Sequence, residues 1–262
     1  MKISIIGAGA MGGALAEGLM QSDAVSASDL TISDPSEAAI SRFSDSGASI
    51  TTDNNVAAKH ADIVMVVVKP WLVETVLKGI KPSLDYQRQL IVVIAAGVSS
   101  KSILSWLDKG DLVQPKLLLA IPNTAIAVKE SMTFLVPVTT TKSETDIIHQ
   151  LFEEVGHCLL TEERLLAAGT TLASCGIAYA MRYVRASVEG GVEIGFRASD
   201  ALQIVLQTVK GAVSLLQATG HHPETEIDKV TTPGGVTIKG LNEMENAGFT
   251  SAVIRGLKAG MK

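Results

Sequence analysis

The fold of this chain is decided by residues 3–12, which read Ile3-Ser4-Ile5-Ile6-Gly7-Ala8-Gly9-Ala10-Met11-Gly12. A short apolar run typical of a buried strand leads into glycines spaced G-x-G-x-x-G, and a helical pattern of apolar and small residues follows Gly12. Such glycines permit a tight turn, a close approach of the backbone to a ligand, and close packing of the helix on the strand. The stretch therefore predicts a strand, a turn and a helix whose N-terminus binds a phosphate.

The sequence around this stretch alternates strand and helix patterns from residue 2 to about residue 160. Short β-branched or apolar runs recur, and the candidate strands are Ile3–Ile6, Leu30–Ile32, Ile63–Val68, Leu90–Ile94, Lys116–Ile121 and Thr133–Val136. Several are almost wholly apolar, as expected of strands buried on both faces. We predict an α/β fold in which residues 1–160 form a Rossmann-type, doubly wound sheet that binds a dinucleotide.

The pattern changes after Thr161. Apolar residues then follow a 3.6-residue spacing, with stripes at Tyr179-Val184-Val188 and along residues 202–216. We predict that residues 161–262 form an all-α domain that binds substrate and mediates dimerisation. Because so many of its helical positions are apolar, we expect a homo-oligomer, either a dimer or a multiple of dimers.

Composition narrows the possible partners. Apolar residues make up 47% of the chain and charged residues 19%, which is typical of a folded globular protein. Acidic residues outnumber basic ones 27 to 22, and no basic cluster indicates nucleic acid. The apolar run at residues 63–68 is far shorter than the ~20 residues needed to cross a bilayer. We expect no membrane partner and a small-molecule substrate.

Cysteine and histidine usage fits a reducing compartment and no metal. Cys158 and Cys175 form no CxxC pair, and the histidines lack metal-ligand spacing. Glu17 and several glycines interrupt the apolar N-terminus, so we interpret it as mature structure rather than a signal peptide. The expected location is the cytoplasm.

The cofactor site is predicted first at the glycine turn, where Gly7, Gly9, Ala10, Met11 and Gly12 would hold the pyrophosphate. Asp34 ends the second strand 22 positions beyond Gly12, near the offset at which an acidic residue meets the adenosine ribose. Asp34 in that role would favour NAD over NADP. Alternatively, Asp34 only turns the chain before Pro35 and caps the next helix.

Further cofactor contacts are predicted where other strands and loops reach the same edge of the sheet. The candidates are Asn54, Val68, Lys69, Pro70, Ala96, Gly97 and Asn123. The alternatives are a solvated lysine and ordinary asparagine turns. Ser33 and Ser36 could bond a 2′-phosphate, so the sequence leaves NAD(H) and NADP(H) both open.

A loop in the helical half is the candidate substrate site. It reads Thr231-Thr232-Pro233-Gly234-Gly235-Val236-Thr237 and runs into a helical pattern. Free N–H groups at a helix start together with hydroxyls are an arrangement that binds a carboxylate. Simple capping of the helix by Thr232 is the alternative.

The chain resembles the pyrroline-5-carboxylate reductase family along its whole length. The matching motifs are the glycine turn, Val-Lys-Pro at 68–70, Ala-Gly-Val-Ser at 96–99, Pro-Asn-Thr at 122–124, Ala-Tyr at 178–179, Gln-Thr at 207–208, Gly-Ala at 211–212, His-Pro at 222–223, and the segment from Asp228 to Glu245.

This resemblance implies reduction of 1-pyrroline-5-carboxylate to L-proline with NAD(P)H, the last step of proline biosynthesis, by an intertwined helical dimer. By analogy, Thr237 is the catalytic residue and bonds the ring nitrogen, while Thr232, Gly234 and Gly235 hold the substrate carboxylate. A neutral threonine is a poor acid, so positioning and electrostatics are expected to carry the catalysis.

The chain also departs from the family pattern. Leu119, Ile121 and Ala125 replace Arg, Met and the second Pro around Pro-Asn-Thr; Ser174, Cys175 and Ile177 alter the Gly-Ser-Gly-Pro motif; Arg185 and Glu189 replace acidic residues. Two other functions therefore stay open: reduction of a related cyclic imine carboxylate, and a regulator that binds the cofactor without catalysis.

Overall fold

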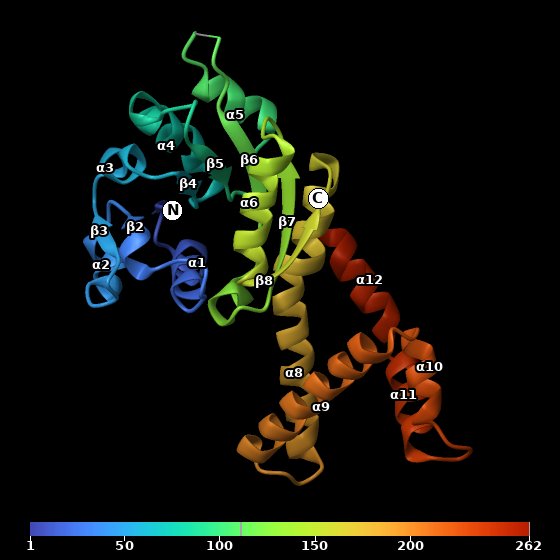
Figure 1. Ribbon diagram of the computed structural model, residues 1–262. Helices are drawn as coiled ribbons and strands as arrows, with labels where there is room; N and C mark the ends of the chain where they lie inside the picture. The colour runs from blue at the N-terminus through green and yellow to red at the C-terminus, as the bar shows by residue number, and fades with distance from the viewer. Residues whose placement is uncertain (111, 262) are drawn as a thin grey trace. The chain divides into compact units, whose positions relative to one another are not determined.

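The computed structural model describes residues 1–110 and 112–261. The chain folds as two compact units, Met1–Ile177 and Ala178–Lys262. The first holds a sheet between two layers of helices, and the second consists of helices (Figure 1).

An eight-stranded sheet forms the centre of the first unit. Its spatial order is β3-β2-β1-β4-β5-β6-β7-β8. The strands are β1 Ile3–Ile6, β2 Leu30–Ser33, β3 Ser49–Thr51, β4 Ile63–Val66, β5 Leu90–Val93, β6 Lys116–Ile121, β7 Ser131–Pro137 and β8 Gly156–Leu160. The pairs from β3 to β6 are parallel, β7 pairs antiparallel with β6, and β8 is parallel to β7. The predicted doubly wound α/β fold is confirmed.

Helices cover both faces of this sheet. The α-helices of this unit are α1 Ala10–Met20, α2 Glu37–Ile40, α3 Asn54–Lys59, α4 Val73–Ile80, α5 Ser100–Leu107, α6 Lys142–Glu153 and α7 Leu166–Gly169. Residues of α1, α2 and α6 share one buried cluster with one face of the central strands, whereas α3, α4 and α5 share the other. The sheet is therefore buried on both sides, which explains the nearly continuous apolar strands.

Two strands escape prediction from the sequence. β3 is only three residues long and partly exposed, so it lacks an apolar run. β8 begins at Gly156, whose φ of 145° is unfavourable for other residues, and its apolar residues Leu159 and Leu160 stay exposed. Both strands lie at the edges of the sheet, where one side of the strand has no neighbour and burial is weak.

Short helical turns complete the first unit. The 3₁₀ turns are η1 Ala27–Asp29, η2 Ser41–Phe43, η3 Pro70–Leu72, η4 Lys81–Ser83, η5 Thr124–Val128 and η6 Glu163–Leu165, and a π-helical turn, η7, spans Thr170–Ser174. Close packing at Gly18 is needed because a Cβ there would overlap the carbonyl oxygen of Ile126 in η5. The turn η5 is thus held directly against α1.

The segment after residue 160 begins inside the first unit. The Glu163 carboxylate accepts a 2.7 Å hydrogen bond from the backbone N–H of Ser100, and the Ser174 hydroxyl donates to the carbonyl of Pro122 at 3.0 Å. These contacts place the end of the compact unit at Ile177, later than the change of sequence pattern at Thr161. The predicted ranges 1–160 and 161–262 divide the chain by role, and that division stays a prediction.

The second unit is helical, as the sequence predicts. It holds most of α8 Cys175–Glu193, then α9 Ala198–Thr219, α10 Pro223–Lys229, α11 Val236–Asn246 and α12 Phe249–Ala259. Packing inside the unit includes the edge-on contact of Tyr183 with Phe249, with ring centroids 6.5 Å apart. Gly191 packs against Ala201, where α8 meets α9.

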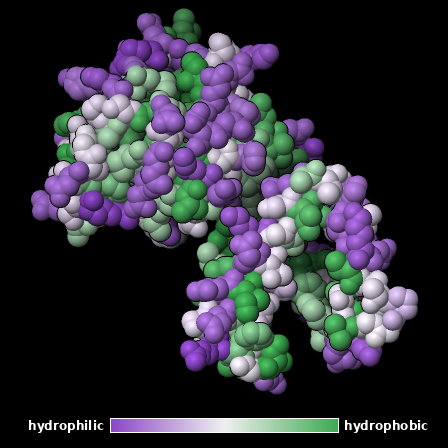
Figure 2. All heavy atoms as spheres, turned by 60° about the horizontal axis from the view of Figure 1, so that its bottom comes forward, coloured by the Kyte–Doolittle hydropathy of each residue, from purple (hydrophilic) through white to green (hydrophobic). Residues whose placement is uncertain are grey.

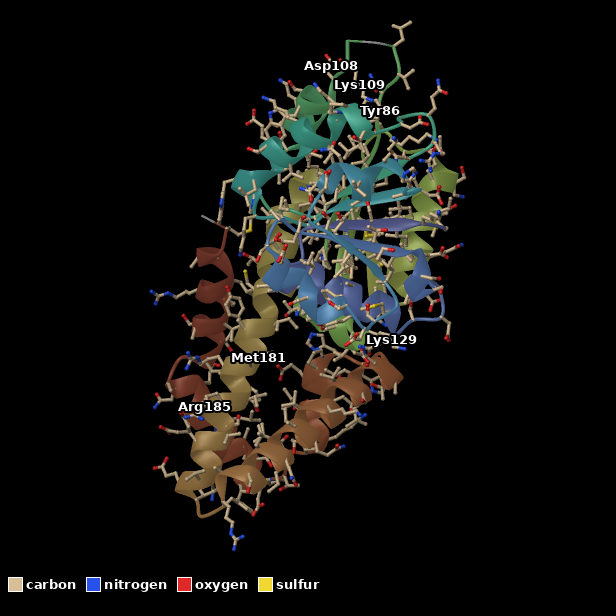
Figure 3. The ribbon with its side chains drawn as sticks, turned by 90° about the vertical axis from the view of Figure 1, so that its left-hand side faces the viewer. Tyr86, Asp108, Lys109, Lys129, Met181 and Arg185 are labelled. Carbon is tan, nitrogen blue, oxygen red and sulfur yellow. The ribbon has the colours of Figure 1, made fainter. Side chains whose placement is uncertain are left out.

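Many apolar side chains of this unit are exposed. Met181 on α8 is 65% exposed, and α9 presents Leu202, Leu206 and Val213 at 43–51% exposure. Figure 2 shows apolar residues among the surface residues of these helices. Figure 3 shows Met181 and Arg185 on successive turns of α8, and Arg185 pairs with Glu189 at 2.8 Å. A single copy of the chain thus leaves an apolar helical surface uncovered.

Within the part of the chain that the structure describes, no helix is long and apolar enough to cross a membrane. The same residues contain no group of three or more histidine, cysteine, aspartate or glutamate side chains that could hold a metal ion.

Candidate functional site

The three glycines of the turn after β1 are each needed for a different structural reason. Gly7 has a φ of 105°, and a Cβ there would overlap the carbonyl oxygen of Val67. A Cβ on Gly12 would overlap the carbonyl oxygen of Gly7. A Cβ on Gly9 would meet no atom within 4 Å. Gly7 and Gly12 are therefore required by the fold, whereas Gly9 keeps open the space through which a ligand approaches the backbone.

The N-terminus of α1 is available to an anion. Its N-cap is Gly9, no side chain bonds the first N–H groups, and the first turn has no acidic residue. The positive end of the helix dipole adds to these free donors. The geometry fits a phosphate at this point, as the sequence predicts.

A cavity of about 470 Å³ lies beside this turn, at the carboxyl ends of the central strands. The predicted cofactor residues that line it are Gly7, Gly9, Ala10, Met11, Asp34, Val68, Lys69, Pro70 and Ala96. The Lys69 side chain is exposed and makes no hydrogen bond or ion pair among the described residues. It is the cation that this cavity offers to an anionic ligand.

Asp34 turns the chain before Pro35, which is one of the two roles that the sequence leaves open. One carboxylate oxygen accepts from the backbone N–H of Ala8 at 2.8 Å, and the other accepts from that of Ser36 at 2.9 Å. The first bond braces the glycine turn and the second forms a turn before α2. The N-cap of α2 is Ser36, so Asp34 forms the turn without capping that helix. Asp34 also lines the cavity, so its role in the turn is compatible with a ligand contact.

A second cavity, of about 540 Å³, adjoins the first and shares Gly7, Asp34, Val68 and Leu72 with it. Asn54 lines this cavity at the start of α3. Its Oδ1 accepts a 2.7 Å hydrogen bond from the buried Ser33 hydroxyl, which fixes the amide. The two cavities together extend from the ends of the central strands to the ends of β2 and β3.

Three predicted cofactor residues do not line either cavity. Gly12 lies under the turn, and Gly97 has a φ of 77° in the loop after β5. Asn123 is buried and caps η5, because its side chain accepts from the N–H of Ala125. The observed geometry gives these residues roles in shaping the edge of the site.

Sequence reasoning missed part of the cavity wall. Thr170 and Ser174, both on the π-helical turn, line the first cavity together with Ile121 and Thr124. Such π-helical turns are frequent at functional sites. Nothing in the sequence pattern indicates the turn; the only signal is that Ser174 and Ile121 depart from the family motifs.

The candidate substrate loop leads into α11. Gly234 has a φ of 72°, Gly235 is the N-cap, and its N–H donates to the Thr232 carbonyl at 2.9 Å. No side chain caps the helix, so the alternative of a Thr232 cap is wrong. Thr237 is exposed in the first turn, and its hydroxyl makes no bond within the described residues.

The helix before this loop is held by a charge cluster. The Lys229 ammonium donates to the Glu226 carboxylate at 2.7 Å, and a His221 ring nitrogen lies 2.6 Å from the same oxygen. The hydrogen bond from Lys229, followed by that from His221, lowers the pKa of Glu226. The cluster links His221, which lies just before α10, to Lys229 at the end of α10, immediately before the loop.

Comparisons with known proteins agree with both regions. The family model described as "Pyrroline-5-carboxylate reductase dimerisation" matches residues 163–262, and "NADP oxidoreductase coenzyme F420-dependent" matches residues 2–97. Pyrroline-5-carboxylate reductase 1 of Dictyostelium discoideum is 36% identical over 97% of this chain, which spans only 48% of that protein. Pyrroline-5-carboxylate reductase 2 of the same organism is 35% identical over 98% of this chain and 89% of its own length.

A solved structure shares the fold. The pyrroline carboxylate reductase of Plasmodium falciparum, with NADP bound, superposes with a TM-score of 0.90 at 24% identity, covering 100% of this chain and 95% of that one. The two-part sequence match, the full-length relative and the glycine-turn geometry agree with one another. The chain therefore belongs to the pyrroline-5-carboxylate reductase family.

Proposed function

We propose that this chain reduces the C=N bond of 1-pyrroline-5-carboxylate to give L-proline, using NADH or NADPH, as the last step of proline biosynthesis. The observation that carries the proposal is the cavity between the glycine turn and the π-helical turn. A dinucleotide fits there because Gly9 leaves the backbone open and the start of α1 is uncapped. The substrate is proposed from the similarity of nearly the whole chain to a pyrroline-5-carboxylate reductase.

In this proposal the turn holds the pyrophosphate through the N–H groups at the start of α1, and Lys69 adds a positive charge at the strand ends. The reduced nicotinamide supplies a hydride to the carbon of the C=N bond when it is bound. Gly7, Ala10, Met11, Val68, Pro70 and Ala96 shape the cavity around the dinucleotide. These residues contribute chiefly by positioning the dinucleotide, because a reactant that is already held in place loses less entropy in reaching the transition state.

The substrate is assigned to the loop before α11. The carboxylate binds at the uncapped first turn of α11, next to Thr232, Gly234 and Gly235. The first turn offers N–H groups and Thr232 offers a hydroxyl, while the Gly235 N–H is bonded to the Thr232 carbonyl and shapes the loop. Thr237 donates a hydrogen bond to the ring nitrogen, which favours the developing amine. Thr237 is neutral, so solvent supplies the proton and the hydroxyl orients the ring.

The active form is a homo-oligomer, a dimer or a multiple of dimers. The exposed apolar faces of α8 and α9 and the match to a dimerisation domain support it. The cytoplasm is the proposed compartment, supported by two free cysteines, Cys158 and Cys175.

The test follows oxidation of NADH and of NADPH, separately, by purified protein with racemic 1-pyrroline-5-carboxylate. Thr237→Ala should lower kcat about 100-fold with an unchanged dinucleotide Kd, by analogy with loss of one positioned donor. Thr225→Ala is the matched control, because Thr225 lies exposed on α10 with no side-chain bond among the described residues. Binding of dinucleotide without turnover would contradict the proposal and favour a cofactor-binding regulator.

A second substrate is favoured by one observation. Ile121 and Ser174 both line the first cavity, and both depart from the family pattern. A six-membered cyclic imine carboxylate should therefore be assayed beside the five-membered one. Faster turnover of the larger ring would replace the proposed substrate with the related imine.

A further inference from the structure

The second cavity carries information on which dinucleotide the chain selects. It lies at the carboxyl ends of β2 and β3, beyond the glycine turn from the first cavity. In a sheet of this order the adenosine half of a dinucleotide occupies that side of the turn. The inference rests on the proposed function only in assuming that a nicotinamide dinucleotide binds here.

The charges that line this cavity are all negative. Asp34 and Asp53 are its charged lining residues, and no lysine, arginine or histidine among the described residues joins them. The rest of the lining is apolar or neutral, with Thr52, Asn54, Asn55 and Thr75 as hydrogen-bonding side chains. A dianionic 2′-phosphate would therefore enter a site that offers it no cation.

Asp34 is positioned to distinguish a hydroxyl from a phosphate. Its two backbone hydrogen bonds, from Ala8 and Ser36, hold the carboxylate in one orientation. A carboxylate has about four acceptor positions, so two remain for donors. Ribose hydroxyls can donate to them, whereas the oxygens of a 2′-phosphate only accept and share the negative charge of the carboxylate.

Asp53 adds a second negative charge to the same wall. It caps α3, where one of its oxygens accepts from the Asn55 N–H at 2.8 Å. This bond orients the carboxylate of a residue that lines the cavity.

The nearest candidate phosphate ligand, Arg42, is engaged elsewhere. Its guanidinium lies 3.3 Å from the Glu17 carboxylate, 3.4 Å from the Ala8 carbonyl and 4.7 Å over the Phe43 ring. It also packs against Gly13, where a Cβ would overlap it. Arg42 braces α1 and the turn from outside the cavity lining.

We propose that Asp34, assisted by Asp53, makes this chain select NADH against NADPH. The selection is exerted at the ribose 2′ position, through acceptance of hydroxyl donors and repulsion of the phosphate.

Calorimetric titration of the protein with NAD⁺ and with NADP⁺ tests the proposal without using turnover. NAD⁺ should bind at least about tenfold more tightly, because the 2′-phosphate of NADP⁺ is repelled by the carboxylates that it would approach. NADP⁺ binding as tightly as NAD⁺ would overturn the proposal.

Three variants test which side chain causes the NAD⁺ preference. Asp34→Asn keeps the shape and one backbone acceptor while removing the charge, and should reduce the NAD⁺ preference about tenfold. Asp53→Asn, which retains a good helix cap, should reduce it less. Glu37→Gln removes an exposed charge on α2 outside the cavity lining and should leave both Kd values unchanged.

Arg42→Met separates this explanation from a phosphate clamp. Because Arg42 braces the turn, both dinucleotides should weaken together and their ratio should stay constant. A selective loss of NADP⁺ binding would overturn the assignment of selectivity to Asp34.

The outcomes also separate this inference from the proposed function. Turnover of 1-pyrroline-5-carboxylate with equal use of both cofactors would leave the reductase in place and overturn the selectivity. Preferential NAD⁺ binding without turnover would support the selectivity and contradict the reductase. If Asp34→Asn fails to fold, the wild-type binding ratio and Asp53→Asn still decide.

Discussion

The two units of this chain differ in how far they bury their apolar side chains. In the first, both faces of the sheet are covered by the unit's own helices, and residues such as Ile5, Met65 and Val92 are fully buried. In the second, long helices display Met181, Leu206 and Val213 at about half exposure or more. The first unit completes its own core, whereas the second needs another surface to cover its helices.

This contrast extends to the candidate sites. The cofactor cavity is built from backbone that the sheet core holds, since Gly7 and Gly12 fit only against neighbouring strands and loops. The loop before α11 is exposed, and its geometry comes from local turns and the charge cluster on α10. We therefore expect substitutions in the sheet core to alter the candidate cofactor cavity. We expect substitutions that disturb self-association to alter the candidate substrate loop.

The largest expected effect is on assembly. Leu206→Asp places a charge on the exposed apolar face of α9 and should weaken self-association at least about 100-fold, as loss of a central interface residue does. Light scattering should show a smaller particle, and reductase activity should fall with it. Val56→Asp, at a similarly exposed apolar residue of α3 in the first unit, is the control. If the mass of the Leu206→Asp particle is unchanged, the apolar face of α9 is not covered by self-association.

The next largest effects are expected in the glycine turn, where one glycine is needed for stability and another for dinucleotide binding. Gly12→Ala should cost about 1–3 kcal/mol of unfolding free energy, because the new methyl group overlaps the Gly7 carbonyl oxygen. Gly9→Ala should leave the melting temperature unchanged and weaken dinucleotide binding at least about tenfold. Thermal melts and calorimetry measure the two quantities. Equal destabilisation by both substitutions would contradict the distinct roles of the two glycines.

A smaller effect concerns a charge in the first unit. The Lys116 ammonium lies 2.9 Å from Glu144, and this hydrogen bond, with those at Thr141, lowers the Glu144 pKa below 4.5. The folded-state pKa is depressed, so the stabilisation is present above pH 4.5 and is lost as pH falls through the folded-state pKa.

Glu144→Gln should therefore lower the unfolding free energy at neutral pH by about 1 kcal/mol, with a smaller difference in acid. Urea melts at fixed protein concentration measure it. Glu130→Gln is the control, since the Glu130 side chain has no hydrogen bond or ion pair among the described residues. A difference that grows in acid would contradict the sign of the pKa shift.

The smallest effect is on thiol chemistry. Burial, and then the Glu153 charge, raises the Cys158 pKa to about 12. At pH 8 only about 1 in 10,000 of these thiols is a thiolate, so the native protein should not be modified there. Cys158→Ser should leave the number of thiols that react with a disulfide reagent unchanged. A loss of one reactive thiol would show that β8 opens in solution.

Local patterns predict most of the central architecture. The first strand, its turn and α1 follow from residues 3–12 because tight turns and buried strands are encoded over short stretches. The edge strands β3 and β8 do not, because one is short and the other presents exposed apolar residues. The π-helical turn at Thr170–Ser174 also leaves no periodic signal, although it forms one wall of the cavity.

The sequence by itself determined the α/β class, the glycine turn, the helix that follows this turn and the family, since each rests on residue type and near-neighbour spacing. Only the tertiary structure decided what Asp34 bonds, that Arg42 is engaged outside the cavity, and that Ser174 joins its wall. Those facts depend on contacts between residues far apart in the chain, and the spacing of residues along a sequence carries no record of such distances.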